Sequence, residues 1–185
     1  MFYTKSYLRD LSRTGRKGTK TFSATVNESK NSMSFDIFLS HSYRDKEYIE
    51  GLFLELSSKG FKVYVDWIVD SHLDRKNVDK RTVALIRNRM KQSKSLIYAT
   101  SENASTSKWM PWELGYMDGE TSRCAILPIT DYENSTFEGQ EFLSVYPYVT
   151  KESVKGLVTG NISTEEILWL NENSKSYQSL KEWLR

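Results

Sequence analysis

The chain has 185 residues, enough for one domain with a full hydrophobic core. Its 26 basic and 24 acidic side chains nearly cancel, so the net charge favours neither nucleic acid nor an anionic membrane as a partner. The single cysteine, Cys124, excludes an intramolecular disulfide and a cysteine-rich metal site, and we expect no bound metal.

The sequence contains no recognisable signal peptide or membrane span. Its N-terminus lacks an apolar core of signal-peptide length, and no stretch approaches the roughly 20 apolar residues that a transmembrane helix needs. A lone cysteine also fits a reducing compartment. We therefore expect a cytoplasmic protein without a membrane partner.

Residues 1–33 are predicted to form a basic N-terminal extension that ends in a Ser/Asn-rich stretch. The main interpretation is a solvated, partly disordered arm, and the alternatives are an arm for an anionic partner or a strap for self-association. Several apolar residues indicate that its start docks on the rest of the chain: Phe2, Tyr3, Tyr7, Leu8 and Leu11.

From Ser34 onward, short apolar runs alternate with helical patterns. Asp45 is the expected N-cap of the first helix, and Gly60 its end. The buried face of that helix has the i, i+3, i+4, i+7 spacing of Ile49, Leu52, Phe53 and Leu56. Strands are predicted at 35–39, 61–67, 95–100, 125–129 and 146–149, with further helices around Val83–Met90 and at 109–117.

This alternation predicts an α/β domain over residues 34–150. It has a parallel sheet of about five strands with helices on both faces, because crossovers of this length join parallel strands. A capping-box pattern from Ser163 to Glu166 and a stripe of Tyr177, Leu180 and Leu184 predict that residues 151–185 form a helical C-terminal extension packed on that domain.

Ligands of such sheets bind outside the carboxyl ends of the strands, which nominates the loops after Leu39, Val65 and Ala99. His41, Ser42, Tyr43 and Arg44 follow the first strand, and Arg44 is the cation there that could meet a pyrophosphate. A histidine at a strand end is also commonly a packed or capping residue, and Arg44 could be a plain surface residue. The polar segment 68–79 after Trp67 is expected to be an exposed loop.

Trp109 and Glu113 lie one turn apart on the predicted third helix, so an indole could shield a carboxylate from water on one helix face. Two simpler interpretations stay open. Trp109, like Trp112, could be a core residue, and Glu113 could be a first-turn carboxylate favoured by the helix dipole.

These segments resemble the Toll/interleukin-1 receptor (TIR) domain family. The matching residues are Phe35–Asp45, Gly60–Asp66 and Ser101 through Trp109 to Glu113, within a resemblance that spans residues 34 to about 130. The run from Tyr98 to Gly115 is more similar to bacterial stand-alone TIR proteins, such as those of Thoeris anti-phage defence systems, than to animal adaptors. The Pro-Gly pattern common in the family after the second strand is absent, and Asp70–Asp79 stands there instead.

The resemblance implies a flavodoxin-like fold and, in the enzymatic branch, cleavage of NAD between nicotinamide and ribose. NAD is then a substrate, and no cofactor is expected. The family's catalytic glutamate falls on Glu113. The expected nucleotide-binding residues are His41, Ser42, Tyr43, Arg44, Trp67 and Trp109.

The expected products are nicotinamide and either ADP-ribose or a cyclised isomer that acts as a second messenger in phage defence. The resemblance also implies assembly with itself or with other TIR domains and a phage-derived trigger.

Other functions remain possible at this point. The chain could be a non-enzymatic TIR assembly module that pairs through residues 68–79, or a nucleoside deoxyribosyltransferase-like enzyme, which also uses a glutamate on this type of fold. A response-regulator receiver would need acidic residues where His41-Ser42 and Thr100-Ser101 stand. Hydride transfer and ATP hydrolysis lack a Gly-rich phosphate loop.

Overall fold

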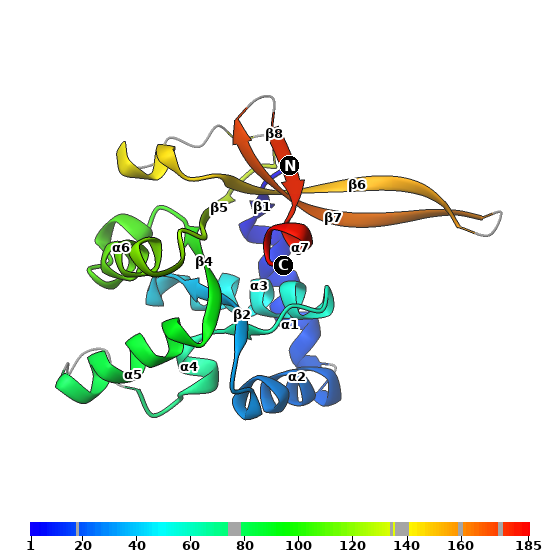
Figure 1. Ribbon diagram of the computed structural model, residues 1–185. Coiled ribbons are helices and arrows are strands. Elements are labelled where there is room, and N and C mark those ends of the chain that lie inside the picture. Colours follow the sequence, from blue (N-terminus) through cyan, green and yellow to red (C-terminus); the bar gives the residue numbers. More distant parts are fainter. Residues whose placement is uncertain (18, 74–78, 134, 136–140, 159–160, 174–175) are drawn as a thin grey trace.

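A computed structural model describes the chain except residues 18, 74–78, 134, 136–140, 159–160 and 174–175 (Figure 1). In chain order the elements are β1 (Tyr3–Thr4), α1 (Lys5–Lys17), α2 (Thr19–Asn31), β2 (Phe35–Ser40), η1 (Tyr43–Asp45), α3 (Lys46–Ser58), β3 (Val63–Tyr64), α4 (Asp66–Val69), α5 (Lys80–Lys91), β4 (Ser93–Thr100), η2 (Ala104–Thr106), α6 (Trp109–Thr121), β5 (Cys124–Thr130), η3 (Glu141–Val145), β6 (Tyr148–Val158), β7 (Asn161–Asn173), β8 (Ser176–Ser179) and α7 (Leu180–Trp183).

The described strands form one sheet of eight, in the order β3-β2-β4-β5-β6-β7-β8, with β1 paired to β5. The strands from β3 to β6 are parallel, whereas β7 and β8 run antiparallel to their neighbours. The order of the parallel part is that of a flavodoxin-like sheet, whose strand order reverses between β2 and β4. The predicted α/β fold class is confirmed, with more strands than the five expected.

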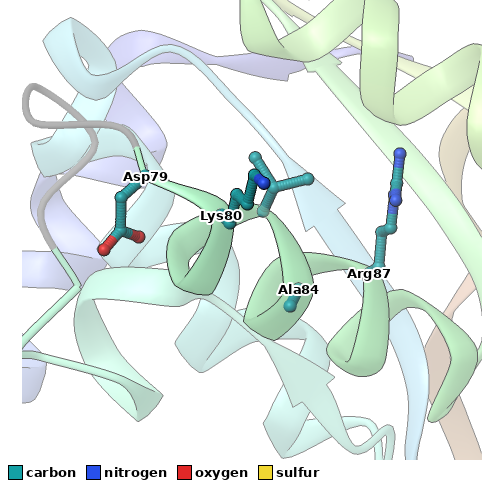
Figure 2. Close-up of a pocket in the computed structure, with 5 residues that line it drawn as sticks. Asp79, Lys80, Ala84 and Arg87 are labelled. Atoms are coloured by element: carbon teal, nitrogen blue, oxygen red, sulfur yellow. The ribbon is translucent and has the colours of Figure 1, made fainter.

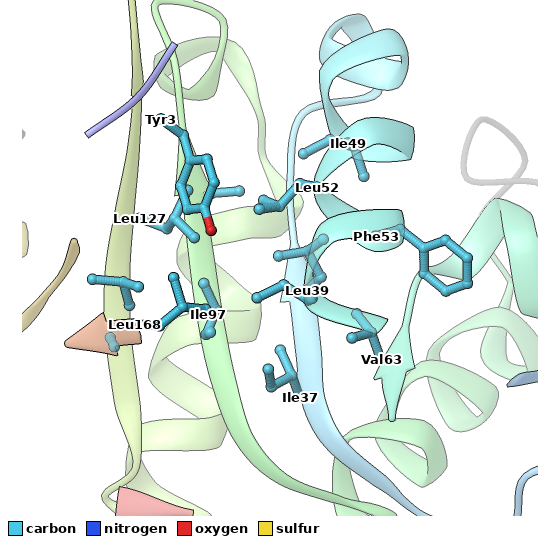
Figure 3. Packing of buried hydrophobic residues seen from close by; sticks show 14 of the residues in the cluster. Tyr3, Ile37, Leu39, Ile49, Leu52, Phe53, Val63, Ile97, Leu127 and Leu168 are labelled. Atoms are coloured by element: carbon cyan, nitrogen blue, oxygen red, sulfur yellow. The ribbon is translucent and has the colours of Figure 1, made fainter. Parts of the chain in front are cut away.

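Two hydrophobic cores lie on opposite faces of this sheet. The first contains residues of α1, α3 and α7 together with alternate residues of the parallel strands. Figure 3 shows Ile37, Leu39 and Ile97 of these strands beside residues of α3. The second packs α5 and α6 on the intervening residues, among them Phe38 and Tyr98. Because side chains alternate between faces along a strand, each parallel strand contributes to both cores.

The N-terminal segment is folded, which corrects the expectation of a solvated arm. Tyr3 and Leu8 are fully buried in the first core, and β1 pairs with β5 through Tyr3 and Ile129. Helix α1 then packs along α3 so closely that a Cβ on Gly51 would overlap the backbone carbonyl of Leu8. Docking of the apolar N-terminal residues, as predicted, is what orders the segment.

Polar contacts fasten the same segment. Met1 and Lys151 exchange backbone hydrogen bonds of 3.1 and 3.0 Å. The Lys151 ammonium lies 3.9 Å from the centre of the Tyr7 ring, a cation–π contact at a largely buried position. The Tyr7 hydroxyl donates to Glu55 on α3 at 3.1 Å, and Arg16 on α1 forms a bidentate ion pair with Glu50 on α3.

The C-terminal segment is mainly strand, so the prediction of helices there is wrong. β6 and β7 form a long antiparallel ribbon that projects from the body of the molecule (Figure 1), and β6 crosses the predicted boundary after residue 150. Leu168 and Leu170 are both buried, which is the two-residue period of a strand. Tyr177 lies on β8, and among the described residues after 150 only the short α7 is helical.

The segment after β3 begins as a helix and not as an exposed loop. Ile68, Val69 and Asp70 are buried, the first two within the hydrophobic cores. The Asp70 carboxylate accepts two 2.8 Å hydrogen bonds from Arg89 and one of 2.9 Å from the Tyr64 hydroxyl. His72 is exposed, as expected, and residues 74–78 of this predicted loop lie outside the described part. No helix among the described residues is long and apolar enough to cross a membrane.

Candidate active site

The carboxyl ends of β2 and β4 meet at the point where strand order reverses. Ser40 ends β2, and its partner across the parallel ladder is Tyr98, two residues before the end of β4. Helix α6 starts at Trp109 and packs on this pair of strands from the face that carries Phe38 and Tyr98. The fold therefore directs residues of α6 onto the edge where sheets of this type bind ligands.

Glu113 lies on the second turn of α6, and none of its surface is exposed to solvent. The Ser40 hydroxyl donates a hydrogen bond of 2.6 Å to its Oε2 atom. This contact ties the carboxylate to the end of β2, across 73 residues of sequence. Ser40 was not among the predicted site residues, although strand alternation after Phe38 was enough to place it on the face that α6 covers.

Tyr98 brings a second hydroxyl to the same face. Its side chain is fully buried, and burial first and the negative charge of Glu113 second raise the pKa of Tyr98 to about 12. The phenol therefore keeps its proton at neutral pH. Tyr98 was also missed, because a tyrosine within an apolar strand looks like an ordinary core residue.

Trp109 is partly buried one turn before Glu113, as the helical spacing predicted. Its ring meets that of Trp112 edge-on at 5.6 Å between centroids, and Trp112 lies 6.0 Å from Tyr116. The three rings form an aromatic row along α6. The Arg87 guanidinium of α5 lies 5.8 Å from the centre of the Trp112 ring.

His41 and Trp67, both predicted to contact the nucleotide, are bonded to each other. The Trp67 indole N–H donates to His41 Nε2 at 3.1 Å, so the neutral imidazole donates from Nδ1 to the Leu39 carbonyl at 2.9 Å. His41 is buried, and Lys46 lies 4.6 Å from the centre of the Trp67 ring. In this structure the two residues hold the loops after β2 and β3 together.

The other predicted ligand residues split between interior and surface. Ser42 is buried, and its hydroxyl caps η1 by accepting from the backbone N–H of Arg44 at 3.4 Å. Tyr43 and Arg44 are exposed. A ligand at this edge could therefore reach Tyr43 and Arg44 directly, whereas Ser42 acts on the loop.

Asp45 is fully buried and joins the loops that follow β2 and β4. Its carboxylate accepts from the Ser101 hydroxyl at 2.6 Å and from the Asn103 amide at 2.7 Å. The residue stands at the N-cap position of α3, as predicted, but its side chain makes no capping hydrogen bond there. Its role is to fix two loops beside Ser40 and Glu113.

A cavity of about 720 Å³ lies along α5, lined by Asp79, Lys80, Val83, Ala84 and Arg87 (Figure 2). Arg87 lines this cavity and also contacts Trp112, so the cavity adjoins the aromatic row. Because all five lining residues come from α5 and its N-cap, this cavity is open to solvent on its other side. The described residues contain no group of three or more His, Cys, Asp or Glu side chains placed to hold a metal.

Known proteins are similar to this chain over most of its length. A family profile described as TIR domain matches residues 37–150, a span that includes Glu113 and every predicted ligand residue. A Bacillus cereus (strain MSX-D12) protein named "Probable 3' cyclic ADP-D-ribose synthase ThsB'" is 45% identical over 164 residues, 88% of this chain and 81% of that relative. A Cytobacillus dafuensis protein with the provisional name cyclic ADP-D-ribose synthase TIR2 is 32% identical over 91 residues, 49% of this chain and 24% of that relative.

Proposed function

Because the chain belongs to the TIR domain family, we propose that it is an NAD-consuming enzyme that cleaves the bond between nicotinamide and ribose. The observation that carries the proposal is the buried Glu113 carboxylate, which Ser40 holds at the ligand-binding edge of the sheet one turn from Trp109. The names of the two relatives support NAD as the substrate.

The chemistry needs only one carboxylate. As the bond breaks, its electron pair leaves with nicotinamide, which departs as a neutral base and takes no proton, and the ribose becomes an oxocarbenium-like cation. Glu113 stabilises that cation by its charge, and burial strengthens the effect because little water screens it. The Trp109 indole would cover the nicotinamide ring and keep water from the carboxylate.

A cyclic product is the favoured outcome. A hydroxyl of the adenosine half of the same molecule attacks the cationic carbon, forms the new C–O bond and loses its proton to Glu113, whereas attack by water would give linear ADP-ribose. A site closed to solvent favours the internal hydroxyl. The relatives' names support this product, and we propose second-messenger signalling in Thoeris-type phage defence as its context.

Substrate must first reach a carboxylate that has no solvent exposure. We therefore propose that activity requires the site to open, through assembly with another copy or another TIR domain or through a phage-derived trigger. The isolated chain at low concentration should then show little turnover, and turnover per molecule should rise with protein concentration.

Mass spectrometry of NAD incubated with dilute and concentrated protein tests the proposal. Wild type should release nicotinamide together with a partner of the mass of cyclic ADP-ribose, which is one water lighter than linear ADP-ribose. Glu113→Gln should leave NAD intact. If concentrated wild-type protein also leaves NAD intact, the chain is better explained as a non-enzymatic TIR assembly module.

A further inference from the structure

The Tyr98 hydroxyl is a buried polar group that the proposed mechanism does not use. The ring belongs to the second core, where it is grouped with Met110 and Leu114, the α6 residues on either side of Glu113. Ser40, which holds Glu113, is the partner of Tyr98 across the β2–β4 ladder. Neighbouring strands thus present two hydroxyls to the helix that carries the carboxylate.

The two hydroxyls differ in what they bond. Ser40 donates to Glu113, whereas the Tyr98 hydroxyl makes no hydrogen bond with any residue that the structure describes. Buried polar groups in native proteins nearly always have a partner, and leaving one without a partner costs free energy. Tyr64, on the same face of the sheet, follows the usual rule, because its hydroxyl donates to Asp70 at 2.9 Å.

The Tyr98 hydroxyl stays protonated at neutral pH and can therefore donate a hydrogen bond. Burial and the charge of Glu113 raise the pKa of Tyr98 to about 12, so the hydroxyl carries its proton throughout the neutral range. Tyr98 is also the ladder partner of Ser40, whose hydroxyl bonds Glu113, so the phenol and the carboxylate lie at the same place on the sheet. A ligand that meets Glu113 therefore comes near this hydroxyl as well.

We propose that Tyr98 is a substrate-binding residue whose hydroxyl donates a hydrogen bond to a ribose hydroxyl oxygen of the nicotinamide riboside half of NAD. The inference rests on the proposed function and assigns the two strand hydroxyls different tasks. Ser40 orients the carboxylate, and Tyr98 contacts the sugar that the carboxylate stabilises. Glu113 and Tyr98 are both closed to solvent, so the proposed opening of the site has to expose both groups before they can contact the same ribose.

Tyr98→Phe and Tyr64→Phe form a matched pair that tests this. Both remove one hydroxyl from a fully buried tyrosine on the same face of the sheet. Tyr98→Phe should raise KM for NAD about tenfold with a smaller change in kcat, and its Tm should equal or exceed that of wild type. Tyr64→Phe should lower Tm, because Asp70 loses a partner, and should leave KM unchanged.

The opposite pattern overturns the inference. If Tyr98→Phe lowers Tm and leaves KM unchanged, the hydroxyl serves the fold through an ordered water. An unchanged KM with unchanged Tm also rejects a role in binding substrate. Wild-type protein is assayed in parallel, so a failure of the proposed function shows separately, as NAD that stays intact with wild type itself.

Discussion

Two glutamates are buried on opposite sides of the sheet, and different kinds of donor hold them. Glu50 on α3 is 1% exposed and faces the Arg16 guanidinium, which brings a full opposite charge. Glu113 on α6 is 0% exposed and accepts from the Ser40 hydroxyl, which brings none. An ion pair suits a contact that must hold α1 on α3, whereas the Ser40 hydroxyl positions the Glu113 carboxylate without adding a charge of its own.

The largest expected effect tests whether Glu113 serves catalysis and Glu50 serves stability. Glu113→Gln should lower the rate of nicotinamide release by about 10²–10³ and leave Tm close to that of wild type, because the amide can still accept from Ser40. Glu50→Gln should lower Tm and keep the rate per folded molecule. Parallel rate and melting measurements on both variants check the pair, and loss of NAD cleavage in folded Glu50→Gln would contradict it.

The next largest effect is expected on stability, from a substitution at Gly51, where α1 packs on α3. Gly51→Ala should lower the free energy of unfolding by about 2–3 kcal/mol, because the new methyl group would overlap the Leu8 carbonyl and force α1 away. Gly119→Ala on α6 is the control. A Cβ there meets nothing within 4 Å, so the variant should gain up to about 1 kcal/mol from helix propensity. Equal urea midpoints for the two variants would refute the close packing of α1 on α3.

Removing the cation of the Glu50 pair should have a smaller effect. Arg16→Ala should destabilise the fold by about 1–2 kcal/mol, less than a fully buried pair would lose, because the Arg16 side chain is itself 62% exposed. Arg13→Ala removes a comparable arginine that faces the more exposed Glu47 at 3.6 Å, and should cost less than about 0.5 kcal/mol. Denaturant unfolding of both variants measures the loss of unfolding free energy for each ion pair. An equal loss in the two variants would show that the burial of Glu50 does not strengthen its ion pair.

The smallest expected effect is on the free energy of unfolding at alkaline pH, and it comes from Tyr98, on the same face of the sheet as Glu113. Tyr98 keeps its proton in the folded state up to a pKa of about 12, whereas the unfolded chain loses it near pH 10. Stability from this group is therefore present below pH 10 and lost as pH rises toward 12, by about 1 kcal/mol at pH 11. Free energies of unfolding between pH 9 and 11 should fall less steeply for Tyr98→Phe, and identical slopes would contradict the shift.

The central domain was predictable because its signals are local. Apolar runs of strand length, the helical stripe of α3 and the spacing of Trp109 and Glu113 each lie within a dozen residues. The partners that complete the site are not local. Ser40 and Glu113 are far apart in the sequence, and only the packing of α6 on β2 brings them together. The roles proposed for Glu113 and the nucleotide-binding residues remain predictions.

Helices were wrongly predicted in the C-terminal segment because a helix-capping pattern was preferred to a strand pattern in the same residues. Ser163 and Glu166 match a capping box, but Leu168 and Leu170 have strand spacing. Tertiary pairing decided between them, because β7 has β6 and β8 to bond with. The helices of residues 1–33 were missed for a related reason, since α1 packs on α3 and β1 pairs with β5, both far along the sequence.

The pairing of the N-terminal strand has a consequence for how the chain acquires its fold. Tyr3 pairs with Ile129, and Met1 bonds to Lys151, so these contacts cannot form until residues far later in the sequence have been synthesised. Contacts of such large sequence separation form late and slow folding. Helix α1 can therefore pack on α3 early, whereas Tyr3 should lack its strand partner until β5 has been synthesised, and the contact between Met1 and Lys151 should form only after β6.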